Sequence, residues 1–263
     1  MTSHPTAAIM IVGNEILSGR TQDVNIRFIA ERLAARGIRL TEIRVVRDEE
    51  AAIVRAAREL SQEYDYVFST GGIGPTHDDI TAECIARAFN TTLEINAEAQ
   101  RRMEEYYKSR GTEMNQGRLR MARIPKGAAL IDNPISASPG FKIENVYVMA
   151  GLPKIMQAMF LSLEQTLAPG APILANTVSC ALREGDIALE MEDISKQFPE
   201  VEIGSYPSIV QDGFSLSLVL RATDEKPLKA ATDKLVAMIK RRGDEPSIAY
   251  QRPPAPQRDN PGL

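Results

Sequence analysis

The sequence predicts an α/β protein with a doubly wound, mostly parallel sheet, followed by a smaller α+β domain. Strand and helix signals alternate over the first two-thirds of the chain, which is the pattern of repeated βαβ units. Loops rich in glycine and other small residues follow several of these strands. Beyond the Ala-Pro-Gly-Ala-Pro segment at 168–172 the order of the signals changes, so a second domain is expected to begin there.

The first domain is expected over residues 1–168, and its strands follow from apolar or β-branched runs. These runs lie at 7–12, 38–46, 66–70, 128–131 and 146–150. The run at 7–12 ends at Gly13, and the run at 66–70 leads directly into two glycines. Both therefore predict buried strands that end in tight loops.

The helices of this domain follow from apolar residues at helical spacing and from capping residues. They are expected at 25–35, 48–60, 78–89, 97–110, 114–122 and 152–167. In the first of them Ile26, Ile29 and Leu33 share one face, and Asp48 is expected to cap the second. The fourth is highly polar, which is typical of a helix that faces solvent.

The second domain is expected over residues 173–245, which is long enough for a modest core of its own. Its signals are a strand at 173–182, a helix at 185–198, strands at 201–206 and 214–222, and a helix at 227–241. Residues 251–263 contain four prolines and few apolar side chains, so they are expected to form a disordered tail.

Composition excludes several classes of protein. The 31 basic residues against 35 acidic ones, a net charge of −4, argue against a nucleic-acid-binding surface. No apolar run approaches the roughly 18–20 residues that span a bilayer, and the first residues lack a secretory signal. We therefore expect a cytoplasmic protein without a membrane or nucleic-acid partner. With only Cys84, Cys180, His4 and His77, a disulfide framework, a zinc site and a Ser-His-Asp triad are not expected.

The strongest local signal is the string Thr-Gly-Gly-Ile-Gly-Pro-Thr-His-Asp-Asp-Ile-Thr at 70–81. It lies between a predicted buried strand and a helix, at the carboxyl edge of a parallel sheet, where ligands of this architecture bind. Its glycines allow backbone N–H groups to approach an anion, and the next helix directs its positive end to the same place.

Asp78 and Asp79 stand directly beside this glycine-rich loop. Carboxylates repel a phosphate unless a cation lies between them, so the combination predicts a phosphate ligand bridged by a metal ion. The alternative is a tight turn in which one aspartate only caps the helix. His77 is a candidate general acid or base, although a surface or turn position is the simpler account of it.

Three further loops carry candidate residues. In the loop after the first strand, Glu15 is suited to a metal ion or a ribose, and Arg20 to a phosphate. Small residues fill the loop at 133–140, and Gly151 begins a helix start that also carries Lys154. Each loop alone fits a structural role, but several at successive strand ends favour a ligand crevice.

The 70–81 string resembles the signature of the competence- and damage-inducible protein A (CinA) family, within the wider superfamily of molybdopterin-binding domains. Gly13-Asn14-Glu15, the loop from Asn133-Pro134 to Pro139-Gly140, and Gly151-Leu152-Pro153 resemble three further family motifs. The resemblance covers residues 7–167. The region from 173 resembles the smaller domain of CinA proteins by its layout.

The chain departs from the family pattern at two positions. Asn14 stands where many members have aspartate, and Ser138 where alanine is common. Asp79 corresponds to the aspartate shared by the superfamily, and Asp78 to its CinA-type neighbour. The sequence has no counterpart of the nicotinamide-mononucleotide deamidase domain of full-length CinA proteins, so deamidase activity is not expected.

The resemblance implies a metal-dependent hydrolase that cleaves ADP-ribose to AMP and ribose 5-phosphate, or FAD in the related domain of eukaryotic FAD synthases. A divalent ion (Mg²⁺, Mn²⁺ or Co²⁺) would be held by Asp78 and Asp79, with Glu15 completing its shell or orienting the water. Ligand-binding positions implied by the resemblance are Thr70, Gly71, Gly72, Gly74, Thr76, Gly13, Asn14, Ser136, Ser138, Gly151 and Lys154.

Two other functions remain open from the sequence. One is molybdopterin binding with adenylyl transfer from ATP, a reaction of molybdenum cofactor biosynthesis. It would use the same loops, with an organic phosphate rather than water as the attacking group. The other is a non-catalytic nucleotide-binding module, which the loss of a charge at Asn14 favours. The family also implies a homo-oligomer, either a dimer or a trimer, with a nucleotide or a molybdopterin-type compound as its small-molecule ligand.

Overall fold

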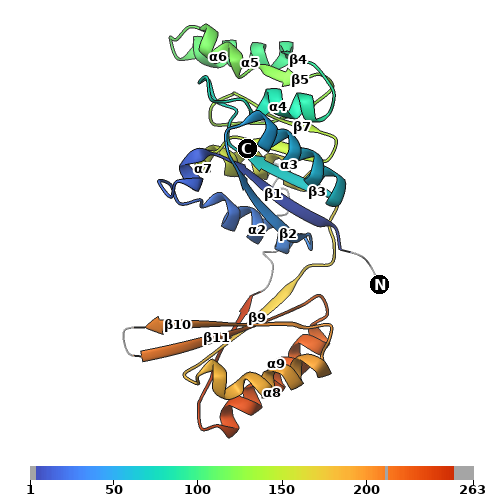
Figure 1. Ribbon diagram of the computed structural model, residues 1–263, viewed down its shortest axis with the longest axis vertical. Helices are drawn as coiled ribbons and strands as arrows, with labels where there is room; N and C mark the ends of the chain where they lie inside the picture. The colour runs from blue at the N-terminus through green and yellow to red at the C-terminus, as the bar shows by residue number, and fades with distance from the viewer. Residues whose placement is uncertain (1–3, 211–212, 252–263) are drawn as a thin grey trace, which may run out of the picture. The chain divides into compact units, whose positions relative to one another are not determined.

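The computed structural model describes residues 4–210 and 213–251. They divide into two compact units (Figure 1). Unit 1 holds the residues up to 33 together with 38–170, and unit 2 holds 34–37 and the residues from 171 onward. Within the described residues, no helix combines the length and the apolar character needed to cross a bilayer.

A six-stranded sheet in the order β2-β1-β3-β8-β7-β6 forms the centre of unit 1. Its strands are β1 (Thr6–Val12), β2 (Arg39–Val46), β3 (Tyr66–Thr70), β6 (Ala129–Ile131), β7 (Gly140–Ile143) and β8 (Val146–Met149). Strands β2, β1, β3 and β8 are parallel. Strand β7 is antiparallel to both of its neighbours, so β6 runs in the same direction as β8. The predicted mostly parallel sheet is confirmed.

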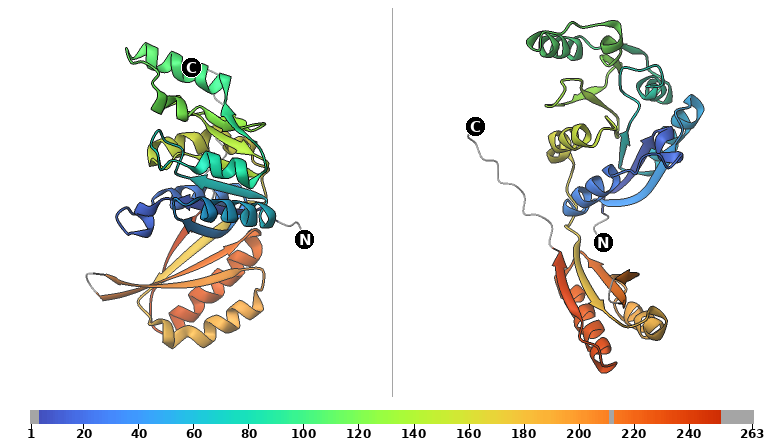
Figure 2. Two further views of the ribbon diagram at one scale, coloured as in Figure 1. Left: turned by 45° about the horizontal axis from the view of Figure 1, so that its top comes forward. Right: turned by 90° about the vertical axis from the view of Figure 1, so that its left-hand side faces the viewer.

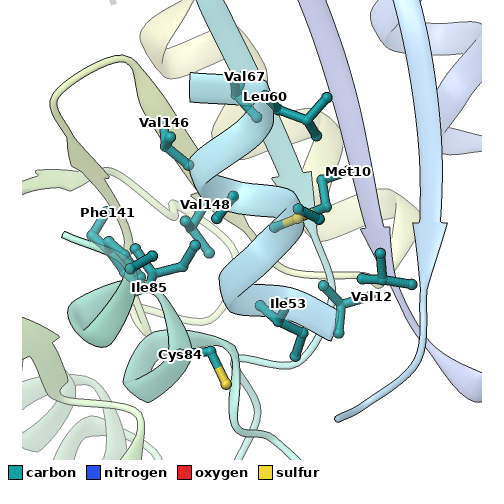
Figure 3. Close-up of a cluster of buried hydrophobic side chains, with 14 of the residues drawn as sticks. Met10, Val12, Ile53, Leu60, Val67, Cys84, Ile85, Phe141, Val146 and Val148 are labelled. Atoms are coloured by element: carbon teal, nitrogen blue, oxygen red, sulfur yellow. The ribbon is translucent and has the colours of Figure 1, made fainter. Parts of the chain in front are cut away.

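Helices cover both faces of this sheet. The elements concerned are α1 (Asn14–Leu17), α2 (Asn25–Ala35), α3 (Glu50–Glu63), α4 (Thr81–Ala88), α7 (Pro153–Leu163) and the 3₁₀ helix η1 (Glu164–Thr166). Successive strand residues point to opposite faces. Ile9 therefore packs in the cluster of α2 and α7, and Met10 in the cluster of α3 and α4. Figure 3 shows the second cluster, where Ile53 and Leu60 of α3 and Ile85 of α4 meet strand side chains.

Between α4 and β6 the chain forms an excursion of its own, residues 93–125, which we call the insertion. Its elements are β4 (Leu93–Ile95), α5 (Ala97–Ser109), α6 (Gln116–Arg120) and β5 (Arg123–Pro125). Figure 1 shows them gathered at one end of unit 1, in green. Asn96 caps α5 by accepting from the Ala99 amide at 3.0 Å, and Asn115 caps α6 by accepting from the Arg118 amide at 2.9 Å.

Unit 2 is a four-stranded antiparallel sheet in the order β10-β11-β9-β12. Its elements are β9 (Leu174–Cys180), α8 (Glu184–Gln197), β10 (Glu202–Val210), β11 (Gly213–Ala222), α9 (Glu225–Arg241) and β12 (Ser247–Gln251). Both helices lie on one face of the sheet (Figure 2), because Leu216, Leu218 and Leu220 of β11 all point to that face.

Several sequence predictions of local structure need correction. Helix α3 begins at Glu50 without Asp48 as its cap, because the Asp48 carboxylate accepts from the Asn14 amide at 2.8 Å instead. Helix α4 begins at Thr81, so Asp78 and Asp79 belong to the loop before it. Strands β4, β5, β7 and β12 were not predicted. Of the predicted disordered tail, Gln251 is the last residue of β12, and the rest lies outside the described residues.

Candidate functional site

The four small-residue loops of the sequence leave the sheet at one edge. They follow β1, β3, β6 and β8, which all run in the same direction, so all four strand ends lie on the same side. The loops after β3 and β8 are in contact. The Gly71 amide donates to the Met149 carbonyl at 3.1 Å. A β-carbon on Gly151 would lie 3.3 Å from the Gly71 Cα.

The turn at Gly71 and Gly72 cannot be built from other residues. Their φ angles are +99° and +68°, in the left-handed region that favours glycine. A β-carbon on Gly71 would lie 2.2 Å from the Val12 carbonyl oxygen, and one on Gly72 would lie 2.1 Å from the Thr81 hydroxyl. The backbone is therefore bare at this turn, as an anion-binding loop requires. Thr70, predicted to bind a ligand, is buried at the end of β3, so its side chain is not at the surface.

Thr76 draws the two aspartates of the loop together. Its amide donates to Asp79 Oδ2 at 2.8 Å, and its hydroxyl oxygen lies 2.5 Å from both Asp79 Oδ2 and Asp78 Oδ1. The hydrogen bond from Thr76, and then the backbone amide of Asp78, hold the pKa of the Asp78 carboxyl below its ordinary value. Gly74 makes room for this arrangement, since a β-carbon there would lie 2.6 Å from Asp79 Oδ2.

This arrangement brings carboxylate and hydroxyl oxygens together with too few protons between them. A hydroxyl carries one proton and cannot donate to both carboxylates, so one of the two short oxygen contacts has no proton in it. Asp79 Oδ1 receives no hydrogen bond from any described residue. Oxygens of Thr76, Asp78 and Asp79 therefore form an electron-rich group that favours a cation.

Glu15 does not join this group. Across the described part of the chain, no three Asp, Glu, His or Cys side chains are arranged to hold a metal ion, so the predicted three-carboxylate shell is not preformed. The physical reason lies in α1, where the Glu15 carboxylate folds back over the helix start. Its oxygens lie 2.6 and 2.7 Å from the place of a β-carbon on Gly13. Asn14 is exposed, and its backbone N–H donates a hydrogen bond to the Asp48 carboxylate.

Asn133 organises the loop at 133–140. Its buried side chain donates to the Ser136 hydroxyl at 2.6 Å and to the Ser138 carbonyl at 2.8 Å. The Tyr106 hydroxyl, on α5, donates to the carbonyl of Ile135 at 3.0 Å. Ser138 is buried, and the Ser136 hydroxyl already serves Asn133, so both predicted ligand-binding serines are engaged within their own loop.

Other predicted residues lie at the surface around this edge. Lys154 is exposed in the first turn of α7, where Pro153 begins the helix as expected. The His77 side chain is 94% exposed, with Nδ1 4.0 Å from Asp78 Oδ1. That exposure agrees with the simpler of the two roles considered for His77. Arg20 is also exposed.

The sequence did not point to Asn25, Arg120 or Arg123. Asn25 donates to the Gly151 carbonyl at 2.8 Å. Arg120 and Arg123 line a pocket with Gly74 and Asp79, which is partly open to solvent and has a cavity volume of about 30 Å³. No local pattern marks the two arginines, because only the folded insertion shows which way they face.

Three buried oxygens near the Gly71–Gly72 turn have no hydrogen-bond partner among the described residues. They are Asn25 Oδ1, Ser69 Oγ and Thr81 Oγ1. Ser69 precedes the turn in β3, Thr81 lies against Gly72, and Asn25 is bonded to Gly151. Buried polar atoms without partners are rare. Their concentration around one turn marks a place where water or a ligand completes the hydrogen bonding.

Residues 8–169 match the family described as "Probable molybdopterin binding domain", and residues 172–244 match "FAD synthase, middle domain". A protein of Pyrobaculum calidifontis is 34% identical over 93% of this chain and 99% of its own length. A probable FAD synthase of Caenorhabditis briggsae is 31% identical over 89% of this chain. This chain spans 49% of that protein.

A solved structure agrees with the fold. The crystal structure of CinA from Thermoplasma acidophilum, a protein described as of unknown function, has 34% identity and a TM-score of 0.58. The match covers 62% of this chain and 98% of that one. Because the match to residues 8–169 covers more than half of the sequence, the chain belongs to the molybdopterin-binding-domain family, in agreement with the CinA resemblance of its motifs.

Proposed function

We propose that unit 1 is a metal-dependent nucleotide pyrophosphatase that hydrolyses ADP-ribose, or a related dinucleotide pyrophosphate such as FAD, to AMP and a sugar or flavin phosphate. The carrying observation is that oxygens of Thr76, Asp78 and Asp79 converge beside the bare Gly71–Gly72 turn. A pyrophosphate needs both features, amide donors around its oxygens and a cation against its charge. The match of residues 172–244 to an FAD synthase domain supports an enzyme that acts on nucleotides.

The donor set fits a hard divalent ion such as Mg²⁺, Mn²⁺ or Co²⁺. All three protein groups offer oxygen, and the lowered pKa of Asp78 keeps its carboxylate ionised at neutral pH. Two carboxylates suffice, because such ions commonly take their remaining ligands from substrate phosphates and water. When bound, the ion neutralises phosphate charge and makes the phosphorus easier to attack.

The chain's own residues would do the rest of the chemistry. Amides of the turn and of Gly74 hold the phosphate oxygens, and Lys154 adds positive charge. Glu15, exposed in α1 after β1, orients the attacking water. The water oxygen forms a new bond to phosphorus and gives up a proton to solvent, the bridging P–O bond breaks, and the departing phosphate takes its electron pair. Both products leave as phosphate monoesters.

The test is to incubate the purified protein separately with ADP-ribose, FAD and ATP. Each reaction runs with Mg²⁺, Mn²⁺ or Co²⁺ and again with a chelator, and chromatography resolves the products. Metal-dependent AMP from ADP-ribose or FAD is the expected result. Asp79→Asn should abolish it, whereas Asp193→Asn, an exposed aspartate of α8, should leave it unchanged. Absence of any turnover would overturn the hydrolase proposal.

A second candidate function is adenylyl transfer from ATP to molybdopterin. The match of residues 8–169 to a molybdopterin-binding family favours it. Here the attacking group is a phosphate of the pterin, so ATP and molybdopterin together would give an adenylylated pterin and pyrophosphate. Binding of these nucleotides without any turnover would instead identify a non-catalytic module.

A further inference from the structure

Arg120 and Arg123 stand at the end of α6 and the start of β5, on the insertion. Both side chains line the pocket that contains Gly74 and Asp79, and both are half-buried. Across residues 4–210 and 213–251, neither guanidinium forms an ion pair or a side-chain hydrogen bond. Gly74 and Asp79 belong to the proposed metal and phosphate loop, so the pocket opens directly beside it.

The other arginines of the insertion are engaged. Arg101 pairs with Glu98 and Glu105, and Arg102 pairs with Glu98 and Asp132. Arg110 lies over the ring of Tyr106, and Arg118 over that of Tyr107. Arg120 and Arg123 are thus the two insertion arginines without such a partner among the described residues, and both face the same pocket.

The acidic groups of the pocket do not neutralise them. Glu83 lines the pocket, but its carboxylate accepts from Arg87 at 2.8 Å. Asp79 is held by Thr76 through both the amide and the hydroxyl. Arg120 is attracted to the Asp78 carboxylate, but neither guanidinium forms a direct ion pair among the described residues, so both can bind an anion that enters the pocket.

The rest of the lining includes apolar residues, among them Ile73, Leu93, Ile124 and Phe141. The pocket is partly open to solvent, and its enclosed part has a volume of about 30 Å³, which is room for one or two water-sized groups. A ligand phosphate would therefore meet the two guanidinium groups at the mouth of the pocket, with its sugar outside.

We propose that Arg120 and Arg123 form a second anion subsite, which binds the phosphate of the half of the dinucleotide that carries no adenosine. The ligand class is a phosphate monoester attached to a polyol or sugar, such as ribose 5-phosphate or a flavin phosphate. This inference rests on the proposed function, since it places the two phosphates of one pyrophosphate on either side of Asp79. It also predicts that the second product is recognised on its own, apart from AMP.

The test uses products, because they contain no pyrophosphate bond and are not consumed. Calorimetry with Mg²⁺ present measures binding of ribose 5-phosphate, flavin mononucleotide and AMP to the full chain. We expect Arg120→Gln and Arg123→Gln each to weaken the binding of at least one of the first two about tenfold, with AMP binding unchanged within twofold. Arg120→Lys should retain part of the affinity. Arg55→Gln, which removes an exposed charge on α3, is the matched control.

Three results would overturn the subsite. They are no binding of either non-adenylate product, no loss when Arg120→Gln and Arg123→Gln are combined, or an equal loss of AMP binding. Thermal unfolding of each variant separates a binding loss from a folding loss. If the protein cleaves no dinucleotide but loses ribose 5-phosphate binding in the arginine variants, the subsite stands and the pyrophosphatase proposal fails. If the protein cleaves a dinucleotide but the arginine variants bind both products as the parent does, the pyrophosphatase proposal stands and the subsite fails.

Discussion

Asn25 donates a hydrogen bond from its side-chain amide to the carbonyl oxygen of Gly151 at 2.8 Å, across 126 positions of sequence. The bond joins the start of α2 to the turn after β8. The turn after β8 also lies against Gly71, because Gly151 has no side chain that would keep the two backbones apart. Asn25 is 4% exposed, so this bond is shielded from bulk solvent. One buried amide thereby fixes the position of one wall of the candidate site.

Replacing this donor by an acceptor should be costly. In Asn25→Asp a buried carboxylate oxygen faces the Gly151 carbonyl, so we expect a loss of about 2–3 kcal/mol in the free energy of unfolding, measured by urea denaturation. Asn115→Asp is the control, because that side chain only accepts a hydrogen bond and an aspartate accepts it equally well. Similar losses in both variants would show that the Asn25 donor has no special role.

The turn glycines differ in what surrounds them, and that difference is measurable. Gly71 and Gly127 both have positive φ, but a β-carbon at 127 meets nothing within 4 Å, whereas one at 71 meets the Val12 carbonyl. Gly127→Ala should cost about 1–2 kcal/mol of stability, from backbone strain alone. Gly71→Ala should cost several kcal/mol more, because a backbone atom of a buried strand cannot move aside. Equal costs would mean that the loop shifts freely.

The hydroxyl of Thr76 should contribute to metal binding. If the enzyme releases AMP as proposed, Thr76→Val should raise the metal concentration needed for half-maximal activity by about 10- to 100-fold, a range typical for lost contacts around a bound metal. Thr76→Ser keeps the hydroxyl beside Asp78 and Asp79 and should stay within a few-fold of the parent. A metal titration of AMP release distinguishes the two, and equal curves for valine and serine would exclude this role.

Arg32 and Glu164 form a partly buried ion pair that joins α2 to η1. The Glu164 side chain is 5% exposed, so Arg32→Met should cost about 3–5 kcal/mol by leaving its charge unpaired. Arg32→Met combined with Glu164→Leu should recover most of that loss. The exposed pair Arg27–Glu31 is the control, and Arg27→Met should cost under about 1 kcal/mol. Denaturation curves of the three variants test this, and a double variant no more stable than Arg32→Met alone would contradict it.

Stability at high pH should report on Tyr64. Burial, followed by the hydrogen bond that its hydroxyl donates to Glu42 at 2.9 Å, raises the pKa of Tyr64 to about 12. The fold thus favours the neutral phenol. Its contribution to stability is fully present below the unfolded pKa near 10, and is lost as the pH rises through about 12. Melting temperatures from pH 9 to 12 should fall less steeply for Tyr64→Phe than for the parent, and identical slopes would refute the assignment.

The sequence predicted the sheet class, the alternation of strands and helices, and the glycine turn, because these follow from local periodicity and from φ angles that glycine favours. It misplaced two helix starts. Asp48 looked like a cap, but the Asn14 amide, far away in sequence, competes for it. Strands β4 and β5 have three residues each, too few for a periodic signal, and they form because they pair with each other.

The site was predictable only in part, for a related reason. Thr76, Asp78 and Asp79 are neighbours in sequence, so a local motif was enough to bring them together. Glu15 and the aspartates are distant in sequence, and their expected meeting depended on side-chain directions that no pattern encodes. Arg120 and Arg123 enter the site from the insertion, whose path depends on the pairing of β4 with β5.

The insertion begins and ends at one place, since Leu93 at its start pairs with Pro125 at its end. An excursion with adjoining ends can be exchanged for another without stretching the sheet that it leaves. The loop with Asp78 and Asp79 lies outside it, between β3 and α4. Under the two proposals above, bond cleavage and choice of the leaving group would be encoded in separate stretches of chain, and a graft of residues 93–125 from a relative would then alter selectivity.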